Sequence, residues 1–223
     1  MSRDLSLEMC DDARAQMPNI PSDTAARARY DGLVQTLIDY VAKQDFPSIE
    51  LEDVANAANM SLDDVRRFLP NPEAAISALA LYYSELAAAE VAKDQIASPD
   101  DNWQGIVHDV FRRGRIFYKK NPVALKIRLG SVQSAGVRHI LMQNGLLFAS
   151  LIQNEVSMHF VIPGNADLTE DFLNAIIITD ALWSMSVYRY GEITDQAIES
   201  SESAVAGYLE QVLGQRLKTR EAA

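Results

Sequence analysis

The sequence predicts an all-α protein, and three observations lead to that fold class. Apolar residues recur every three or four positions along most of the chain, which is the spacing of one face of an α-helix. Ser, Thr, Asp and Asn stand where several of these periodic segments begin, and Gly or Pro follows where several end. A hydrophobic content of 48% in 223 residues is enough for a sizeable core. We therefore expect an N-terminal three-helix helix-turn-helix domain and a C-terminal helical bundle.

Three parts are expected along the chain. Residues 1–22 are polar, mixed in charge and close to two prolines, which favours a mobile N-terminal arm. Residues 23–80 form the helix-turn-helix domain, and residues 81–223 form a ligand-binding and dimerisation domain. No apolar run is long enough to span a membrane, and the chain does not open on a signal pattern. The sequence therefore predicts a cytoplasmic protein without a membrane partner.

The first helix of the N-terminal domain is predicted from Asp23, a suitable N-cap, to about Gln44. Its apolar residues recur at helical spacing and are expected in the core: Tyr30, Leu33, Leu37 and Val41. The next helix is predicted over residues 50–58. Val54, Ala57 and Ala58 lie on one face of it, where small side chains would let another helix approach closely.

A turn is predicted at Asn59–Ser61. Asparagine tolerates the left-handed backbone conformation that ends a helix. The hydroxyl of Ser61 can accept a hydrogen bond from the amide of Asp64, which starts a second short helix. That helix is expected to stop before Pro70. Two short helices joined by such a turn have the geometry of a DNA-reading motif.

These residues resemble the N-terminal pattern of the TetR family of bacterial transcriptional regulators. The matching segments are Val54–Ala55, Ala58–Ser61, Leu69–Pro70 and Asn71–Glu73. Weaker similarity at Thr179–Trp183 extends the resemblance to about residues 24–217. It implies a repressor that binds double-stranded operator DNA, and a homodimer built from the last two helices of each subunit. It also implies release from the operator by a small apolar or amphipathic effector.

The sequence departs from the family pattern at the reading motif. Asn59 replaces a glycine, Asp63 and Asp64 replace Gly-Thr, Arg66 replaces a tyrosine, and Pro72 replaces a lysine. Two carboxylates at the start of a recognition helix repel phosphates, although a carboxylate can accept a hydrogen bond from cytosine N4. The same carboxylates also stabilise a helix N-terminus.

The charge distribution limits the set of DNA contacts. The chain has a net charge of −11, and residues 1–80 carry seven Lys and Arg against fourteen Asp and Glu, a net charge of −7. Arginine is suited to DNA because its guanidinium group fits both phosphate and guanine. We expect five side chains to contact the operator: Arg27, Arg29, Ser61, Arg66 and Arg67.

Six further helices are expected, over residues 72–97, 102–121, 122–130, 135–160, 170–190 and 195–217. Asn71, Asp101, Thr169 and Thr194 are expected as helix caps. Turns are expected at residues 46–48 and 163–165, and a linker at residues 98–101. The helix over residues 170–190 is apolar on two sides and its successor on one, which suits a helical dimer interface.

An apolar cavity in the C-terminal bundle is the expected effector site. Its expected lining is Phe111, Phe117, Phe148, Ile152, Trp183 and Met185. Packed core is an equally good interpretation of each residue. Basic residues gather over residues 112–128, where a solvated face, an anionic partner and a contact with the acidic N-terminal third all remain open.

No catalytic or metal-binding pattern occurs in the sequence. The three histidines lie on different predicted helices without ligand spacing, and the single cysteine, Cys10, has no partner for a disulfide. The sequence therefore predicts no enzyme activity, cofactor or metal. The alternative to a regulator is a protein of the same fold that has lost DNA recognition and binds a lipid-like ligand or a protein partner. Asp63, Asp64 and Pro72 favour that alternative, whereas Ser61 and the two arginines of the recognition helix argue against it.

Overall fold

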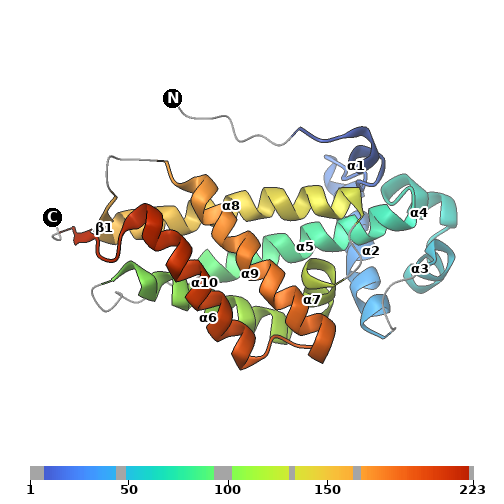
Figure 1. Cartoon of the computed structure of the whole chain (residues 1–223). Coiled ribbons are helices and arrows are strands. Elements are labelled where there is room, and N and C mark those ends of the chain that lie inside the picture. Colours follow the sequence, from blue (N-terminus) through green and yellow to red (C-terminus); the bar gives the residue numbers. More distant parts are fainter. Residues whose placement is uncertain (1–7, 44–48, 93–101, 131–133, 163–166, 221–223) are drawn as a thin grey trace. The chain divides into compact units, whose positions relative to one another are not determined.

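The structure is a computed structural model that describes residues 8–43, 49–92, 102–130, 134–162 and 167–220 (Figure 1). These ranges contain ten helices and a single pair of two-residue strands, which confirms the all-α class. The elements are α1 Asp11–Ala15, α2 Thr24–Ala42, α3 Leu51–Ala58, α4 Leu62–Phe68, α5 Pro72–Ala92, α6 Trp103–Lys120, α7 Pro122–Leu129, α8 Ala135–His159, β1 Phe160–Val161, α9 Thr169–Tyr190, α10 Asp195–Leu213 and β2 Lys218–Thr219.

The chain divides into two compact units, which we call the head unit and the body unit. The head unit contains residues 7–85 and 121–141, and the body unit contains residues 86–120 and 142–223. Helices α5 and α8 each begin in the head unit and continue into the body unit. None of the described helices is both long enough and apolar enough to cross a membrane.

Helix α2 begins and packs as its sequence predicts. The carboxylate of Asp23 accepts a hydrogen bond from the amide of Ala26 at 2.9 Å, which satisfies one of the unpaired N–H groups of the first turn. The four residues predicted for the core are all buried: Tyr30, Leu33, Leu37 and Val41. On α3, however, the buried face is formed by Leu51, Val54 and Ala55. Ala57 is exposed and does not belong to this buried face.

The N-terminal segment differs from the expected mobile arm. Residues 8–22 contain α1, whose Ala13 is buried, and a buried Pro18. The amide of Asn19 donates to the carbonyl of Phe68 at 2.8 Å. This contact forms because the last carbonyls of a helix have no partners within the helix. Residues 8–22 therefore pack against the head unit, whereas residues 1–7 lie outside the described ranges.

Three element ends in the body unit also differ from prediction. Asn102 caps α6 by accepting from the amide of Gly105 at 2.9 Å, and the expected cap, Asp101, lies outside the described residues. Thr169 is the first residue of α9 and not its cap. Its amide and hydroxyl donate to the carboxylate of Asp167, at 3.1 and 2.8 Å. Helix α10 ends at Leu213, about one turn earlier than expected.

The segment after α10 returns to the end of α8. Gly214 has a positive φ of 77°, a backbone conformation that glycine adopts without strain. Its carbonyl accepts from the indole N–H of Trp103 at 3.0 Å. The chain then forms β2, which pairs antiparallel with β1. Strands of two residues show no alternating pattern, so the sequence did not predict this sheet. The turns expected at residues 46–48 and 163–165 and the linker at 98–101 lie outside the described residues.

Candidate nucleic-acid interface

The backbone conformation of Asn59 and the helix cap at Ser61 determine the turn between α3 and α4. Asn59 has φ 52° and ψ 43°, the left-handed conformation predicted for it. The hydroxyl of Ser61 accepts from the amide of Asp64 at 3.1 Å and lies 2.9 Å from a carboxylate oxygen of the same residue. The inner face of α4 is anchored by Val65, and Leu69 follows in the core. The opposite face, including both arginines of this helix, is exposed to solvent.

Asp64 forms ion pairs with arginines on two helices. Its carboxylate lies 3.4 Å from Arg67 and 3.7 Å from Arg29, so it pairs with two of the arginines expected to contact DNA. The sequence predicted its role as a capping partner of Ser61 but missed both ion pairs. The pair with Arg67 has i, i+3 spacing, which a sequence can reveal. The pair with Arg29 joins α2 to α4 and has no sequence signal.

The remaining two arginines also have carboxylate partners. The guanidinium of Arg66 lies 3.8 Å from Glu52 on α3, and Arg27 donates to Asp31 at 2.9 Å. The guanidinium of Arg27 also lies 5.7 Å from the ring centre of Tyr30. Every arginine expected at the operator is therefore paired within the head unit. The pairs are solvent-exposed, so each contributes only about 0–1 kcal/mol.

Tyr30 connects α2 to α4. Its ring meets Phe68 edge-to-face, with ring centres 6.0 Å apart. Burial raises the pKa of Tyr30 to about 12, because the phenolate form would lose its hydration. Helix α4 is thus held by α2 through an aromatic pair, in addition to its own buried residues.

Asp63 differs from its neighbour. Its side chain is exposed and makes no hydrogen bond or ion pair with any residue of the described ranges. The two adjacent carboxylates therefore have different surroundings: Asp64 is neutralised by arginines, and Asp63 presents an uncompensated negative charge. An acceptor in that position suits the N4 amino group of cytosine and repels phosphate.

Comparison with known proteins agrees with this geometry at the level of the fold. No family model and no curated protein matches the sequence. Among solved structures, a TetR-family transcriptional regulator from Streptomyces coelicolor matches with a TM-score of 0.63. The match covers 83% of this chain and 99% of that chain at 20% sequence identity. The chain has the TetR fold. The fold predicted from the helix-turn-helix residues is therefore confirmed.

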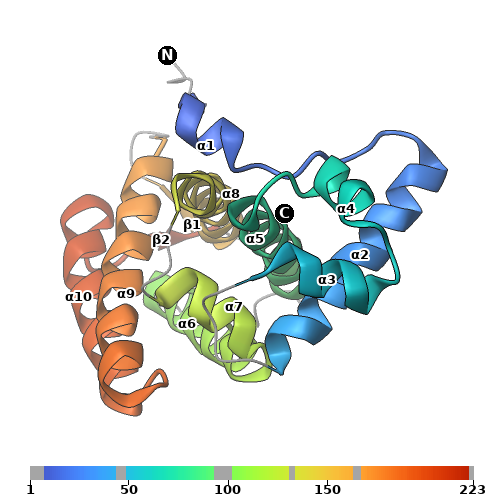
Figure 2. The same ribbon diagram turned by 90° about the vertical axis from the view of Figure 1, so that its right-hand side faces the viewer.

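In this TetR fold, α9 and α10 lie side by side in the body unit (Figure 2). The outer face of α9 exposes apolar residues at intervals of three and four: Ile177, Ala181, Met185 and Tyr188. Met185 is 51% exposed and Tyr188 is 85% exposed. On α10 the exposed residues include Ala204 and Gly207, and a Cβ added to Gly207 would meet no atom within 4 Å. We call these six residues the α9–α10 face.

The residues expected to line an effector cavity fall into two groups. Phe111, Phe117, Ile152 and Trp183 are buried and Phe148 is half-buried, whereas Met185 belongs to the α9–α10 face. The inward orientation expected of Met185 is therefore wrong for this chain. The helical period placed it on an apolar side of α9 but could not distinguish the covered side from the open one.

A cavity of about 310 Å³ occurs elsewhere, in the head unit. It lies between α2 and α5 and is lined by Ile20, Arg27, Tyr30, Asp31, Val34, Gln35, Ala78, Leu81, Tyr82 and Glu85. None of the residues expected to line the effector cavity takes part in it.

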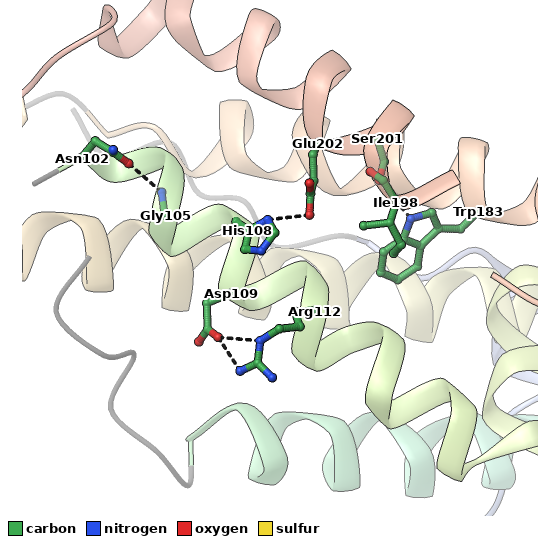
Figure 3. Close-up of polar contacts among 9 residues, drawn as sticks. All are labelled: Asn102, Gly105, His108, Asp109, Arg112, Trp183, Ile198, Ser201 and Glu202. Carbon is green, nitrogen blue, oxygen red and sulfur yellow. Dashed lines mark hydrogen bonds and ion pairs between the residues drawn. The ribbon is translucent and has the colours of Figure 1, made fainter. Parts of the chain in front are cut away.

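Trp183 is the centre of the aromatic packing in the body unit. The rings of Phe111 and Tyr118 meet it edge-to-face, with ring centres 6.0 and 6.2 Å away. Its indole N–H donates to the hydroxyl of Ser201 at 3.0 Å, and both residues are buried (Figure 3). The sequence predicted neither Tyr118 nor Ser201 here, because each contact joins residues of two different helices that only the tertiary fold brings together.

Part of the basic cluster over residues 112–128 is paired within the body unit. Arg112 and Arg113 both donate to Asp109, at 2.7 and 2.6 Å, and Arg115 lies 2.5 Å from Asp195 (Figure 3 shows the first of these). Burial alone would raise the pKa of Asp109, but the two arginine hydrogen bonds outweigh it and hold that pKa below its ordinary value. These three arginines therefore have carboxylate partners on α6 and α10.

Proposed function

We propose that this protein is a TetR-like transcriptional regulator, a repressor that binds double-stranded operator DNA as a homodimer. The observation that carries the proposal is the exposed pair Arg66 and Arg67 on a helix whose inner side is fixed by Val65 and Leu69. A rigid helix with an exposed basic face, at the second position of a helix-turn-helix, is the arrangement that reads the major groove.

DNA binding would proceed by exchange of ion-pair partners. Arg27, Arg29, Arg66 and Arg67 would leave their carboxylates for phosphates or base edges, and Ser61 would add a hydrogen bond to the backbone. Exchange costs little because each exposed pair is weak. The released carboxylates remain close to the DNA, however, and oppose binding at any site that offers no base contact in return. This arrangement favours specific over non-specific binding.

The homodimer would form through the α9–α10 face. Apolar side chains on α9 and small residues on α10 allow the same two helices of a second subunit to pack closely. Such an interface is self-complementary, as two-fold symmetry requires. Two recognition helices related by that symmetry would read a palindromic operator with half-sites about one helical turn apart.

A small apolar or amphipathic effector would act on the body unit. The proposed site lies among Phe111, Phe117, Phe148, Ile152 and Trp183, without Met185. Binding there would release the operator because effector and DNA favour different conformations of the dimer.

The deciding experiment is a titration of the purified dimer against its own upstream intergenic DNA and against a scrambled duplex of equal length, each across a range of salt concentrations. We expect preference for the native duplex and an affinity that falls as salt rises. Absence of any preference at low salt, in a dimeric sample, would contradict the proposal. It would favour instead a TetR-fold binding protein for a lipid-like ligand or a protein partner, to be sought among co-purified molecules.

A further inference from the structure

The last turn of the recognition helix is completed by the N-terminal segment. The amide of Asn19 donates to the carbonyl of Phe68 at 2.8 Å, and its side-chain amide donates to the carbonyl of Arg67 at 3.0 Å. Both carbonyls belong to the final turn of α4 and have no partner inside the helix. A helix of seven residues is not stable by itself in water, so contacts from outside determine its position.

The same segment also caps the first turn of α8. The side-chain oxygen of Gln16 accepts from the amide of Gly136 at 2.9 Å, in the first turn of that helix. The packing here is close: a Cβ added to Gly136 would lie 2.8 Å from the hydroxyl of Ser77 and 3.0 Å from the Cβ of Gln16. That serine hydroxyl is buried and has no hydrogen-bond partner among the residues that the structure describes. Glycine is therefore the residue that lets Gln16 reach the start of α8.

A third contact ties the segment to α5. The side chain of Asn71 caps α5 by accepting from the amide of Ala74 at 2.8 Å, and it donates to the carbonyl of Ala15 at 2.9 Å. Residues 15–19 therefore contact the end of α4, the start of α5 and the start of α8, all within the head unit. Figure 2 shows the segment leaving α1 and passing α4 before it enters α2.

We propose that residues 15–19 are a strap that positions the recognition helix relative to the first turn of α8, with Gln16 and Asn19 as its positioning residues. Only two residues separate them, and one is Pro18, which is buried and has a fixed φ. A displacement of the first turn of α8 is therefore transmitted to Arg67 and Phe68 through a short, stiff connection. The first turn of α8 lies in the head unit, as do the strap and α4. The effect of the strap on DNA binding rests on the proposed function.

The test is hydrogen–deuterium exchange of the native dimer, resolved to the amides of Asn19 and of residues 66–69. In Gln16→Ala the strap loses its link to α8, and we expect exchange at these amides to accelerate about five-fold, the effect of one lost hydrogen bond. Gln16→Glu keeps an acceptor at a helix N-terminus, where a negative charge is favourable, and should restore protection. Gly136→Ala should accelerate the same amides by displacing Gln16.

Gly32→Ala is the matched control, because a Cβ at that α2 glycine meets no atom within 4 Å. It should leave the amides of residues 66–69 unchanged. Faster exchange confined to the first turn of α8 in Gln16→Ala, with α4 unaffected, would show a local cap and overturn the strap. Exchange that rises equally over the whole head unit in Gln16→Ala, Gln16→Glu and Gly136→Ala would also overturn the strap.

A DNA titration separates this inference from the proposed function. If the wild type selects specific duplexes from a randomised double-stranded pool, Gln16→Ala should bind the selected duplex more weakly while its dimerisation is unchanged. If the wild type selects none, the proposed function fails, and the exchange experiment still decides whether the strap exists. Unchanged affinity together with faster exchange at α4 would contradict the role of the strap in DNA reading.

Discussion

The proposed reading surface of the head unit and the α9–α10 face of the body unit present opposite kinds of exposed chemistry. The proposed reading surface consists of Arg27, Arg29, Arg66 and Arg67 with their carboxylate partners. On the reading surface, charges of both signs already satisfy one another, as in the pair Arg67 and Asp64. On the α9–α10 face, apolar side chains such as Tyr188 are exposed to water. An exposed ion pair contributes about 0–1 kcal/mol, whereas burial of one large apolar side chain contributes about 1.5–3 kcal/mol. Binding at the first surface is therefore an exchange governed by salt, and binding at the second is a gain from burial.

Met185→Asp should have the largest effect, because it places a charge in the proposed dimer interface, and two-fold symmetry places two there. Burial of an unpaired charge costs several kcal/mol, so we expect the dimer dissociation constant to rise by about 100-fold or more. Sedimentation equilibrium measures this change. Asn56→Asp adds the same charge to the exposed side of α3 and should leave the dimer intact. An unchanged dimer in Met185→Asp would show that the subunits meet elsewhere.

Arg67→Ala tests the other surface. Loss of a guanidinium contact to a base or phosphate should weaken operator binding by about 1–3 kcal/mol, roughly 5- to 150-fold, without changing dimerisation. Fluorescence anisotropy with labelled operator measures the affinity. Equal affinities of variant and wild type would remove Arg67 from the interface.

Asp64→Asn should shift the balance between specific and non-specific binding. It releases Arg29 and Arg67 from their shared carboxylate while keeping a side-chain acceptor beside Ser61. We expect affinity for a scrambled duplex to rise several-fold. The slope of log affinity against log salt concentration should become steeper by about one. Asp63→Asn removes the same charge from a residue without a partner among the described residues. Identical slopes for the two variants would show that net charge, and not arginine release, controls binding.

Asp109→Asn tests a third kind of charge pair, half-buried in the body unit. The loss of the hydrogen bonds that Asp109 accepts from two arginines should cost about 1–2 kcal/mol at pH 7, measured by urea unfolding. The pKa of Asp109 is lower in the folded chain than in the unfolded chain. The ionised carboxylate therefore stabilises the fold fully at pH values above its unfolded pKa of about 3.9. This stabilisation is lost as the pH falls from that value through the lower pKa of the folded chain. A difference between variant and wild type that persists in strong acid would contradict this origin.

The sequence predicted the features that depend on neighbouring residues. The left-handed Asn59, the cap at Ser61 and the end of α9 at Gly191 follow from the backbone preferences of those residues. The contacts of Asn19 with α4 and of Trp183 with Ser201 did not follow, because each joins residues that only the tertiary fold brings together. Periodicity also identified α9 as apolar on two sides without indicating which side the chain itself covers. The reading surface was therefore predicted as a set of arginines but not as a network of ion pairs.

The positions of the two tryptophans have a consequence for spectroscopy. Trp103 and Trp183 are the only tryptophans of the sequence, and both are buried in the body unit. Intrinsic tryptophan emission therefore reports on the body unit alone, whereas far-ultraviolet circular dichroism reports on the helices of both units. A thermal melt followed by both signals reveals directly whether the two units lose their structure together, because a single cooperative transition requires the two curves to coincide.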